Sequence, residues 1–161
     1  LVCFASCHPD EVVAHTNNVE IDINIKQVSA GYVNVEFSTN KNAFYLSGIH
    51  PVREDIDDIQ KVAKQFMMLA LDSAYVDYLY WRNQQLQQLT PFVTDFASYA
   101  LQYGNTNQYF TMLKPNTDYW VYAFAVDANT NKPTGNLFIK SITTDSVSRT
   151  PMMFEYRVEG Q

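Results

Sequence analysis

Residues 119–126 constrain the fold of this 161-residue chain more than any other segment, because an extended strand there is apolar on both faces. Successive side chains of a strand point to opposite faces. In a domain of two layers only one face of a sheet is sheltered, so the second face of this strand needs another layer. We therefore expect the side chains on that face to contact helices of the same chain: Trp120, Tyr122 and Phe124.

Five further segments alternate apolar and polar residues as half-buried strands do. They are residues 19–26, 32–39, 44–49, 108–113 and 136–143. Short turns such as Ser29-Ala30-Gly31 join the first three, which favours antiparallel pairing. A dense group of turn formers at 127–135 predicts a hairpin loop between the last two strands of the domain.

The hydrophobic period changes between the third and fourth strands of this series. Apolar residues at three-and-four spacing predict a helix over 53–68, and Asp72 or Ser73 is expected to cap a second helix that ends near residue 87. Thr90-Pro91 and Gly104 then frame a third helix over 92–103. These patterns predict an α+β chain of antiparallel strands with a helical insertion at about 53–104.

The corner before the apolar strand carries a family resemblance. Residues 113–119 read Leu-Lys-Pro-Asn-Thr-Asp-Tyr. This run resembles the Leu-x-Pro-x-Thr-x-Tyr corner of fibronectin type III domains, with Leu113, Pro115, Thr117 and Tyr119 in the motif positions. The resemblance implies that the Tyr119 hydroxyl turns back onto backbone a few residues upstream and pins the corner. It also implies that the strands form an antiparallel fibronectin type III-like β-sandwich, with the helical insertion packed on one sheet. The resemblance covers about eighty residues and leaves the helical block unmatched.

The N-terminal residues resemble the end of a bacterial lipoprotein signal peptide. Phe4, Ala5, Ser6 and Cys7 match a lipobox, which implies that Cys7 becomes the first mature residue and carries the lipid. No charged n-region precedes them, so the sequence is expected to begin inside the leader. Two alternatives are that residues 1–6 pack on the domain as an apolar segment, or that Cys3 and Cys7 form a disulfide.

These signals divide the chain into three parts. Residues 1–18 are read as a signal remnant and polar tether, and residues 19–146 as the fibronectin type III-like domain. Residues 147–161 contain a polar linker and an alternating C-terminal strand, which either closes this sandwich or begins a second repeat. A fibronectin-like domain with extra helices resembles those of exported Bacteroidetes lipoproteins, which implies an outer-membrane location that can extend to the cell surface.

Composition argues against several classes of function. Eleven Lys and Arg against 17 Asp and Glu give a formal charge of −6, the wrong sign for gripping phosphate backbones, so we expect no nucleic-acid partner. No stretch approaches the roughly 20 apolar residues that span a bilayer. The expected membrane attachment is therefore the N-terminal lipid alone.

Catalytic and metal-binding patterns are weak throughout the sequence. Its three histidines, His8, His15 and His50, lack the spacing of a metal or triad site. Asp127-x-Asn129-x-Asn131 copies the first half of a calcium loop but lacks its later ligands, which favours a turn. Carboxylates at 54, 55, 57 and 58 suit the start of a helix. We expect no enzyme activity, no cofactor and no bound metal.

The aromatic cluster Tyr75, Tyr78, Tyr80 and Trp81 is the strongest indication of a binding surface. At about 100° per residue the four rings cannot share one helix face, and Tyr78 and Trp81 are expected to lie together while Tyr80 points elsewhere. The alternative is that all four pack between helix and sheet. Exposed Tyr and Trp suit protein interfaces and sugar-stacking surfaces.

The sequence therefore favours a non-catalytic lipoprotein of the cell envelope that acts in protein interaction, adhesion or assembly. One alternative is a glycan-binding accessory of a polysaccharide uptake system. Another is an inhibitor of an enzyme or protease. No residue pattern identifies the protein partner or the glycan.

Overall fold

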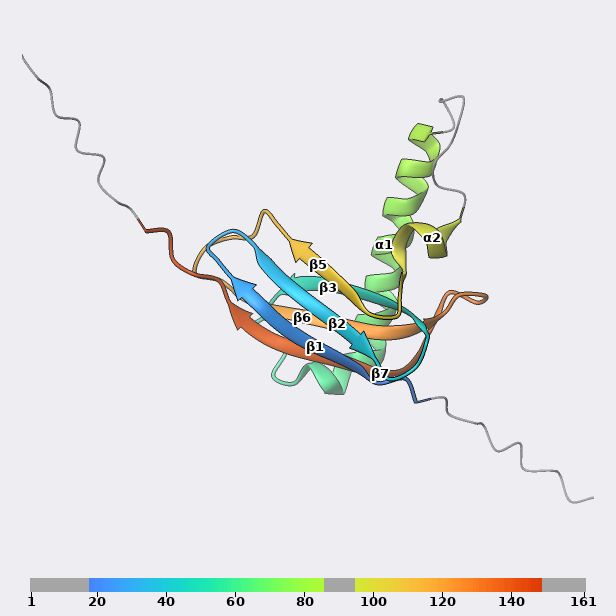
Figure 1. The fold of residues 1–161 in the computed structure, drawn as a ribbon, viewed down its shortest axis with the longest axis horizontal. Coiled ribbons are helices and arrows are strands. Elements are labelled where there is room, and N and C mark those ends of the chain that lie inside the picture. The colour runs from blue at the N-terminus through green and yellow to red at the C-terminus, as the bar shows by residue number, and fades with distance from the viewer. Residues whose placement is uncertain (1–17, 86–94, 149–161) are drawn as a thin grey trace, which may run out of the picture.

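The computed structural model describes residues 18–85 and 95–148, which form two packed sheets and a long helix (Figure 1). The lipobox with Cys7, the residues at 90–91 and the predicted C-terminal strand lie outside these residues. In chain order the elements are β1 (Ile21–Val28), β2 (Val33–Thr39), β3 (Phe44–Pro51), the 3-10 helix η1 (Ile59–Val62), α1 (Ala63–Gln85), α2 (Phe96–Ala100), β4 (Gln102–Tyr103), β5 (Thr106–Phe110), β6 (Asp118–Asp127) and β7 (Lys132–Thr143).

The strands form two antiparallel sheets. One has the order β1-β2-β5 and the other the order β4-β3-β6-β7. Their facing sides enclose a first core centred on Val35, Phe37, Tyr45 and Val121, all fully buried. The predicted α+β class, an antiparallel sandwich with a helical insertion packed on one sheet, is confirmed.

The strand patterns explain how the three-stranded sheet forms. Ile21 and Ile23 on β1 and Val33 on β2 point inward and are buried, whereas Asp22 and Glu36 point outward and are exposed. Strand β1 pairs with β2 in a register that opposes Ile23 to Phe37, with an irregularity between Ile25 and Gln27. This sheet therefore has one apolar and one hydrated face, as the alternation predicts.

Strand β6 is buried on both faces. Val121 and Ala123 belong to the first core, while Phe124 and Val126 belong to a second core with α1. The Phe66 ring of α1 lies 6.4 Å from the Trp120 ring and 5.0 Å from the Tyr122 ring. The prediction that Trp120, Tyr122 and Phe124 contact the helical block is confirmed.

The predicted division of the first helical region is wrong. A single helix, α1, runs from Ala63 to Gln85, and no break occurs at Asp72 or Ser73. Leu71 and Tyr78 continue the buried stripe through that point, and no Gly or Pro lies within the helix to interrupt its hydrogen bonds. Residues 53–58 are not helical, and the Asp58 side chain instead caps η1 by accepting from the Gln60 N–H.

The predicted third helix is also shorter than expected. Helix α2 spans only Phe96–Ala100, and the Asp95 carboxylate accepts from the Ser98 N–H at its start. Gln102 and Tyr103 leave the helical path and pair with the edge of β3 as β4. The open edge of β3 offers backbone partners there, and burial of Leu101 ties the segment to the second core.

Helix α1 crosses the four-stranded sheet and then projects beyond it, with α2 beside its distal half (Figure 1). Within residues 18–85 and 95–148, no helix is both long and apolar enough to cross a membrane.

Candidate functional site

Helix α1 is apolar on the face opposite the core as well as on the face that packs. Met67, Leu71 and Tyr78 belong to the second core, where Tyr78 packs against α2, and they are at most 6% exposed. Leu69, Val76 and Tyr80 are 55%, 64% and 58% exposed. Their spacing of seven and four residues places them in one row on the solvent side of the helix. We call these three residues the outward stripe.

The predicted aromatic cluster is divided between core and surface. Tyr78 is 5% exposed, so it is not available to a partner. Its ring lies 5.9 Å from Phe96 and 5.9 Å from Tyr99, which attaches α2 to α1. Tyr75 is partly exposed and its ring also contacts Phe96.

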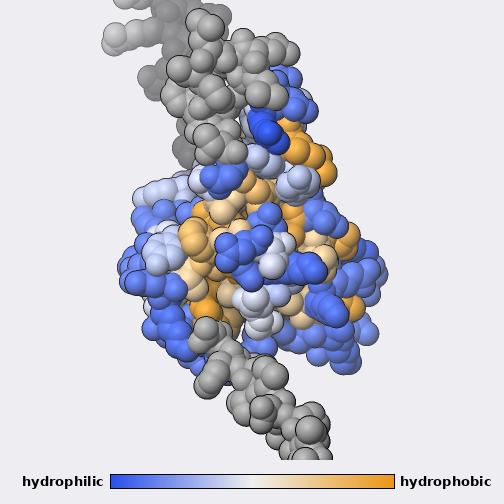
Figure 2. Space-filling view, turned by 90° about the vertical axis from the view of Figure 1, so that its right-hand side faces the viewer, coloured by the Kyte–Doolittle hydropathy of each residue, from blue (hydrophilic) through white to orange (hydrophobic). Residues whose placement is uncertain are grey.

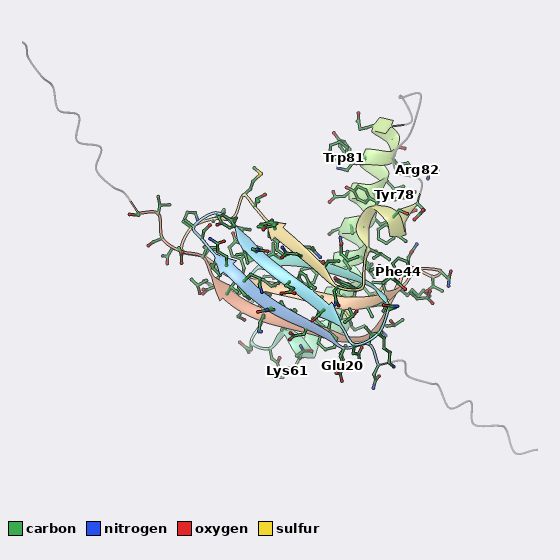
Figure 3. The ribbon with its side chains drawn as sticks, in the orientation of Figure 1. Glu20, Phe44, Lys61, Tyr78, Trp81 and Arg82 are labelled. Atoms are coloured by element: carbon green, nitrogen blue, oxygen red, sulfur yellow. The ribbon has the colours of Figure 1, made fainter. Side chains whose placement is uncertain are left out.

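The remaining two aromatic residues lie together near the distal end of α1. Tyr80 and Trp81 contact each other edge to face, with ring centroids 5.5 Å apart, and both are at least half exposed. Figure 3 shows Trp81 and Arg82 on the part of the helix that projects beyond the sheets. The expected pairing of Tyr78 with Trp81 is therefore wrong, since Trp81 lies against Tyr80. Figure 2 shows hydrophobic surface between hydrophilic patches on the side of the molecule that it presents.

A groove of about 430 Å³ lies between the end of β3, the segment after it and the first turns of α1. Its lining includes His50, Arg53, Phe66, Leu69, Ser73 and Tyr122. Cavities of this size commonly accommodate small molecules or side chains. Leu69 belongs both to this groove and to the outward stripe, so the two features are continuous.

Aromatic rings form the inner wall of the groove around Phe66. The Phe66 ring meets Tyr122 at 90°, Trp120 at 88° and His50 at 78°, with centroid separations of 5.0, 6.4 and 5.9 Å. Edge-to-face contacts of this kind are favourable because the positive ring edge meets the negative face. These ring contacts fix the positions of the aromatic side chains in the groove wall.

Tyr122 lies across Gly48, its direct partner on β3. A Cβ at position 48 would lie 2.4 Å from the Tyr122 hydroxyl oxygen, so the ring occupies space that only glycine leaves free. Burial raises the pKa of Tyr122, so the hydroxyl stays protonated to higher pH than that of a solvent-exposed tyrosine.

The charged groups at the groove rim neutralise each other. The Arg53 Nε and Nη2 donate to the two carboxylate oxygens of Asp55 at 2.9 and 2.5 Å. This pairing lowers the pKa of Asp55 and raises that of Arg53, so both remain charged. His50 Nδ1 lies 2.6 Å from the Pro51 carbonyl oxygen, which accepts a hydrogen bond if that nitrogen carries the proton.

The sequence did not identify this groove. His50, Arg53, Phe66 and Tyr122 are spread over 73 positions, and no local motif links them. One signal was present: Gly48 interrupts a strand, which often marks a close approach of another group.

The residues of the predicted corner before β6 form hydrogen bonds and core contacts. The Tyr119 hydroxyl accepts a 2.9 Å hydrogen bond from the Lys114 N–H, the backbone contact that the fibronectin resemblance implies. Thr117 Oγ1 donates to the Pro115 carbonyl, and Leu113 packs against the first core. The hydroxyl of buried Thr144, the residue after the end of β7, donates to the Lys114 carbonyl and closes the corner.

The loop at Asp127 is a turn, as its sequence favours. The Asp127 carboxylate accepts from the backbone N–H groups of Asn129 and Thr130, and Asn131 adopts a positive φ of 54°. The described ranges contain no group of three or more His, Cys, Asp or Glu side chains arranged to hold a metal ion.

Comparison with models of protein families matches none to this chain, and a search of curated proteins gives no significant match. The residues of the chain itself are therefore the basis for inferring its function.

Proposed function

We propose that this chain is a non-catalytic binding module of the cell envelope that contacts a protein partner through α1. The observation that carries the proposal is the outward stripe. Leu69, Val76 and Tyr80 are each more than half exposed, and they lie on the side of the helix opposite the core.

A helix that packs on a sheet requires only one apolar face, and its other face is ordinarily charged or polar. Between Leu69 and Trp81 the only charged residues of α1 are Asp72 and Asp77. Protein interfaces are enriched in Tyr, Trp and Met and depleted of charge at their centre. The composition of this face therefore suits a protein contact better than permanent exposure to water.

The envelope location rests on the lipobox match at Cys7 and on the resemblance to fibronectin-like domains of Bacteroidetes lipoproteins. The two-sheet fold and the Tyr119 corner are compatible with that resemblance. Labelled palmitate should enter the chain when a bacterium produces it behind a complete lipoprotein signal peptide, and it should not enter the Cys7→Ala variant. Equal labelling of the two proteins would exclude Cys7 as the anchor.

Photo-crosslinking tests the proposed contact surface. A photoreactive phenylalanine analogue placed at Val76 should cross-link a discrete protein in cells that produce the chain. The same analogue at Asn24, an exposed position on the outer face of β1, is the matched control. Adding Leu69→Asp should weaken the Val76 cross-link at unchanged protein level. A cross-link of equal strength from both sites, or none from Val76, would contradict the proposal.

Glycan binding is the second candidate, and the exposed Tyr80–Trp81 pair favours it. Aromatic rings at the projecting end of α1 are accessible for stacking on sugar rings. On a glycan array, Trp81→Ala should abolish a sugar signal, whereas Tyr109→Ala on β5, 62% exposed, should preserve it. Absence of any wild-type signal would eliminate this candidate.

A further inference from the structure

The groove beside Phe66 lies at one end of the surface proposed to bind a protein. Leu69 is shared by the groove and the outward stripe, and Ser73 follows it one helical turn later at the groove margin. A partner segment lying along the stripe would therefore pass over the groove. Interfaces commonly obtain most of their affinity where a large side chain enters such a pocket.

The shape and chemistry of the wall suit an aromatic ring. Phe66 meets three rings edge to face, and two of these, Tyr122 and His50, line the groove with it. The aliphatic side chains of Ile56, Val62 and Leu69 complete an apolar lining. An additional ring can join such a cluster in the tilted or edge-to-face geometry that aromatic pairs prefer.

Two hydroxyl groups of the lining are available for hydrogen bonding. Within the part of the chain that the structure describes, neither the Tyr122 hydroxyl nor the Ser73 hydroxyl has a hydrogen-bond partner. A bound group with a donor or acceptor at its tip would satisfy them. A purely aliphatic side chain would leave them without partners, which is unfavourable once water is excluded.

The charge at the rim argues for an uncharged group. Arg53 is already engaged by both oxygens of Asp55, so the pair presents no net charge to the groove. The attraction of a charged side chain to one member of this pair would be largely offset by repulsion from the other, so a charge on the bound group would add little to binding.

We infer that the groove receives one neutral aromatic side chain, tyrosine or tryptophan, presented by the protein partner that lies along the outward stripe. This inference rests on the proposed function. The ring would pack against Phe66 and Tyr122, and its phenol hydroxyl or indole N–H would bond to the Tyr122 or Ser73 hydroxyl.

The test is a titration of the isotope-labelled full chain followed by ¹⁵N–¹H NMR. The probes are N-acetyltyrosinamide and N-acetyltryptophanamide, with N-acetylalaninamide and methyl β-glucoside as controls. The aromatic amides should shift the backbone signals of Gly48, Leu69 and Ser73 in a saturable way, with a dissociation constant of about 1 mM for so small a ligand. The two controls should leave these signals unchanged.

Filling the groove should remove the binding. Ala70→Leu inserts a larger side chain from the groove wall, and Ser73→Phe fills it from an exposed position that should not disturb folding. Each should weaken binding of the aromatic amides at least tenfold. Asp72→Leu, on the same helix and outside the groove lining, is the matched control and should bind like the wild type.

Three results would overturn the inference: no saturable shift with either aromatic amide, shifts of the same signals by methyl β-glucoside alone, or unchanged binding in both filled variants. The Val76 cross-link reports separately on the proposed function. A retained cross-link without amide binding would refute only the aromatic occupant. Amide binding without a cross-link would support the groove chemistry and count against a protein partner on the stripe.

Discussion

The two sheets of this protein differ in what covers their outer faces. The outer face of β1-β2-β5 carries Asp22, Asn24 and Glu36 and is open to water. The outer face of β4-β3-β6-β7 carries Phe124 and Val126 in a second core beneath α1. A strand can therefore be apolar on both faces only where the chain supplies a third layer.

The same contrast recurs within α1. Its inner face completes the second core, and its outer face repeats apolar residues with no layer of this chain over them in the described ranges. In the four-stranded sheet, an apolar outer face is covered by another layer of the protein. By the same reasoning, we expect the apolar outer face of α1 to be covered by another molecule. That reasoning leads to the binding surface proposed for α1.

The largest expected effect tests whether the second core is as well packed as the first. Phe124→Ala and Phe37→Ala each remove a fully buried ring, one from each core. Both should lower the free energy of unfolding by about 3–5 kcal/mol, because the lost burial is compounded by a cavity. Urea denaturation measures both. If Phe124→Ala lowered the free energy of unfolding by less than about 1 kcal/mol while Phe37→Ala lowered it as expected, α1 would be only loosely packed on the sheet.

A smaller effect is expected at the close contact beneath the groove. Gly48→Ala places a methyl group against the Tyr122 ring and should lower stability by about 1–3 kcal/mol as the ring is displaced. Gly31→Ala is the control, because nothing lies within 4 Å of a Cβ there. Equal denaturation midpoints for the two variants would refute the close packing of Tyr122.

Each core also has a tyrosine whose pKa is raised by burial: Tyr45 within the first core, and Tyr122, partly buried, against the second. Unfolded tyrosine ionises near pH 10, while these two stay protonated to higher pH in the folded state. The folded chain then binds more protons, so the free energy of unfolding should fall as pH rises above about 10. For Tyr45, the hydrogen bond with Thr106 offsets part of the rise in pKa.

Tyr122→Phe should make this alkaline decline shallower in urea denaturation measured from about pH 8 to 11, because its ionisable group is gone. Tyr109→Phe, at an exposed position on β5, serves as the control. If Tyr122→Phe and the wild type declined in parallel, the phenol would not be desolvated as described.

The smallest effect is expected on the outer face of α1. Val76→Lys should change the free energy of unfolding by no more than about 0.5 kcal/mol, because that side chain is 64% exposed. Leu71→Ala on the inner face should lower the free energy of unfolding by about 2–5 kcal/mol. Thermal or urea denaturation compares them, and a large loss in Val76→Lys would mean that the stripe already has a cover within this chain.

Strand positions were predictable because their information is local. Alternation identified β1 and β2 to within about two residues. The segment that is apolar on both faces identified β6 and the need for a layer over Trp120 and Phe124. Helix limits were predicted less well. A cap residue such as Asp72 ends a helix only if the packing ends there too, and Leu71 and Tyr78 continue the packing through it.

The candidate site was predicted only in part. Tyr80 and Trp81 are exposed, as a binding surface requires. Tyr78 is instead buried against Phe96 and Tyr99, which lie about twenty residues later in the sequence. Predicting the outward stripe requires knowing which face of α1 meets the sheet. Predicting the groove requires the strand register that pairs Gly48 with Tyr122 and the packing of α1 that brings Phe66 against Tyr122.

By itself, the sequence determined the two-sheet fold, its corner at Tyr119 and the presence of a helical layer, because hydrophobic period and turn chemistry act between near neighbours. The tertiary structure alone decided which face of α1 remains exposed, that Gln102 and Tyr103 join the sheet, and that a groove forms beside Phe66. Those outcomes depend on contacts between residues distant in the chain, and such contacts leave no periodic mark in the sequence.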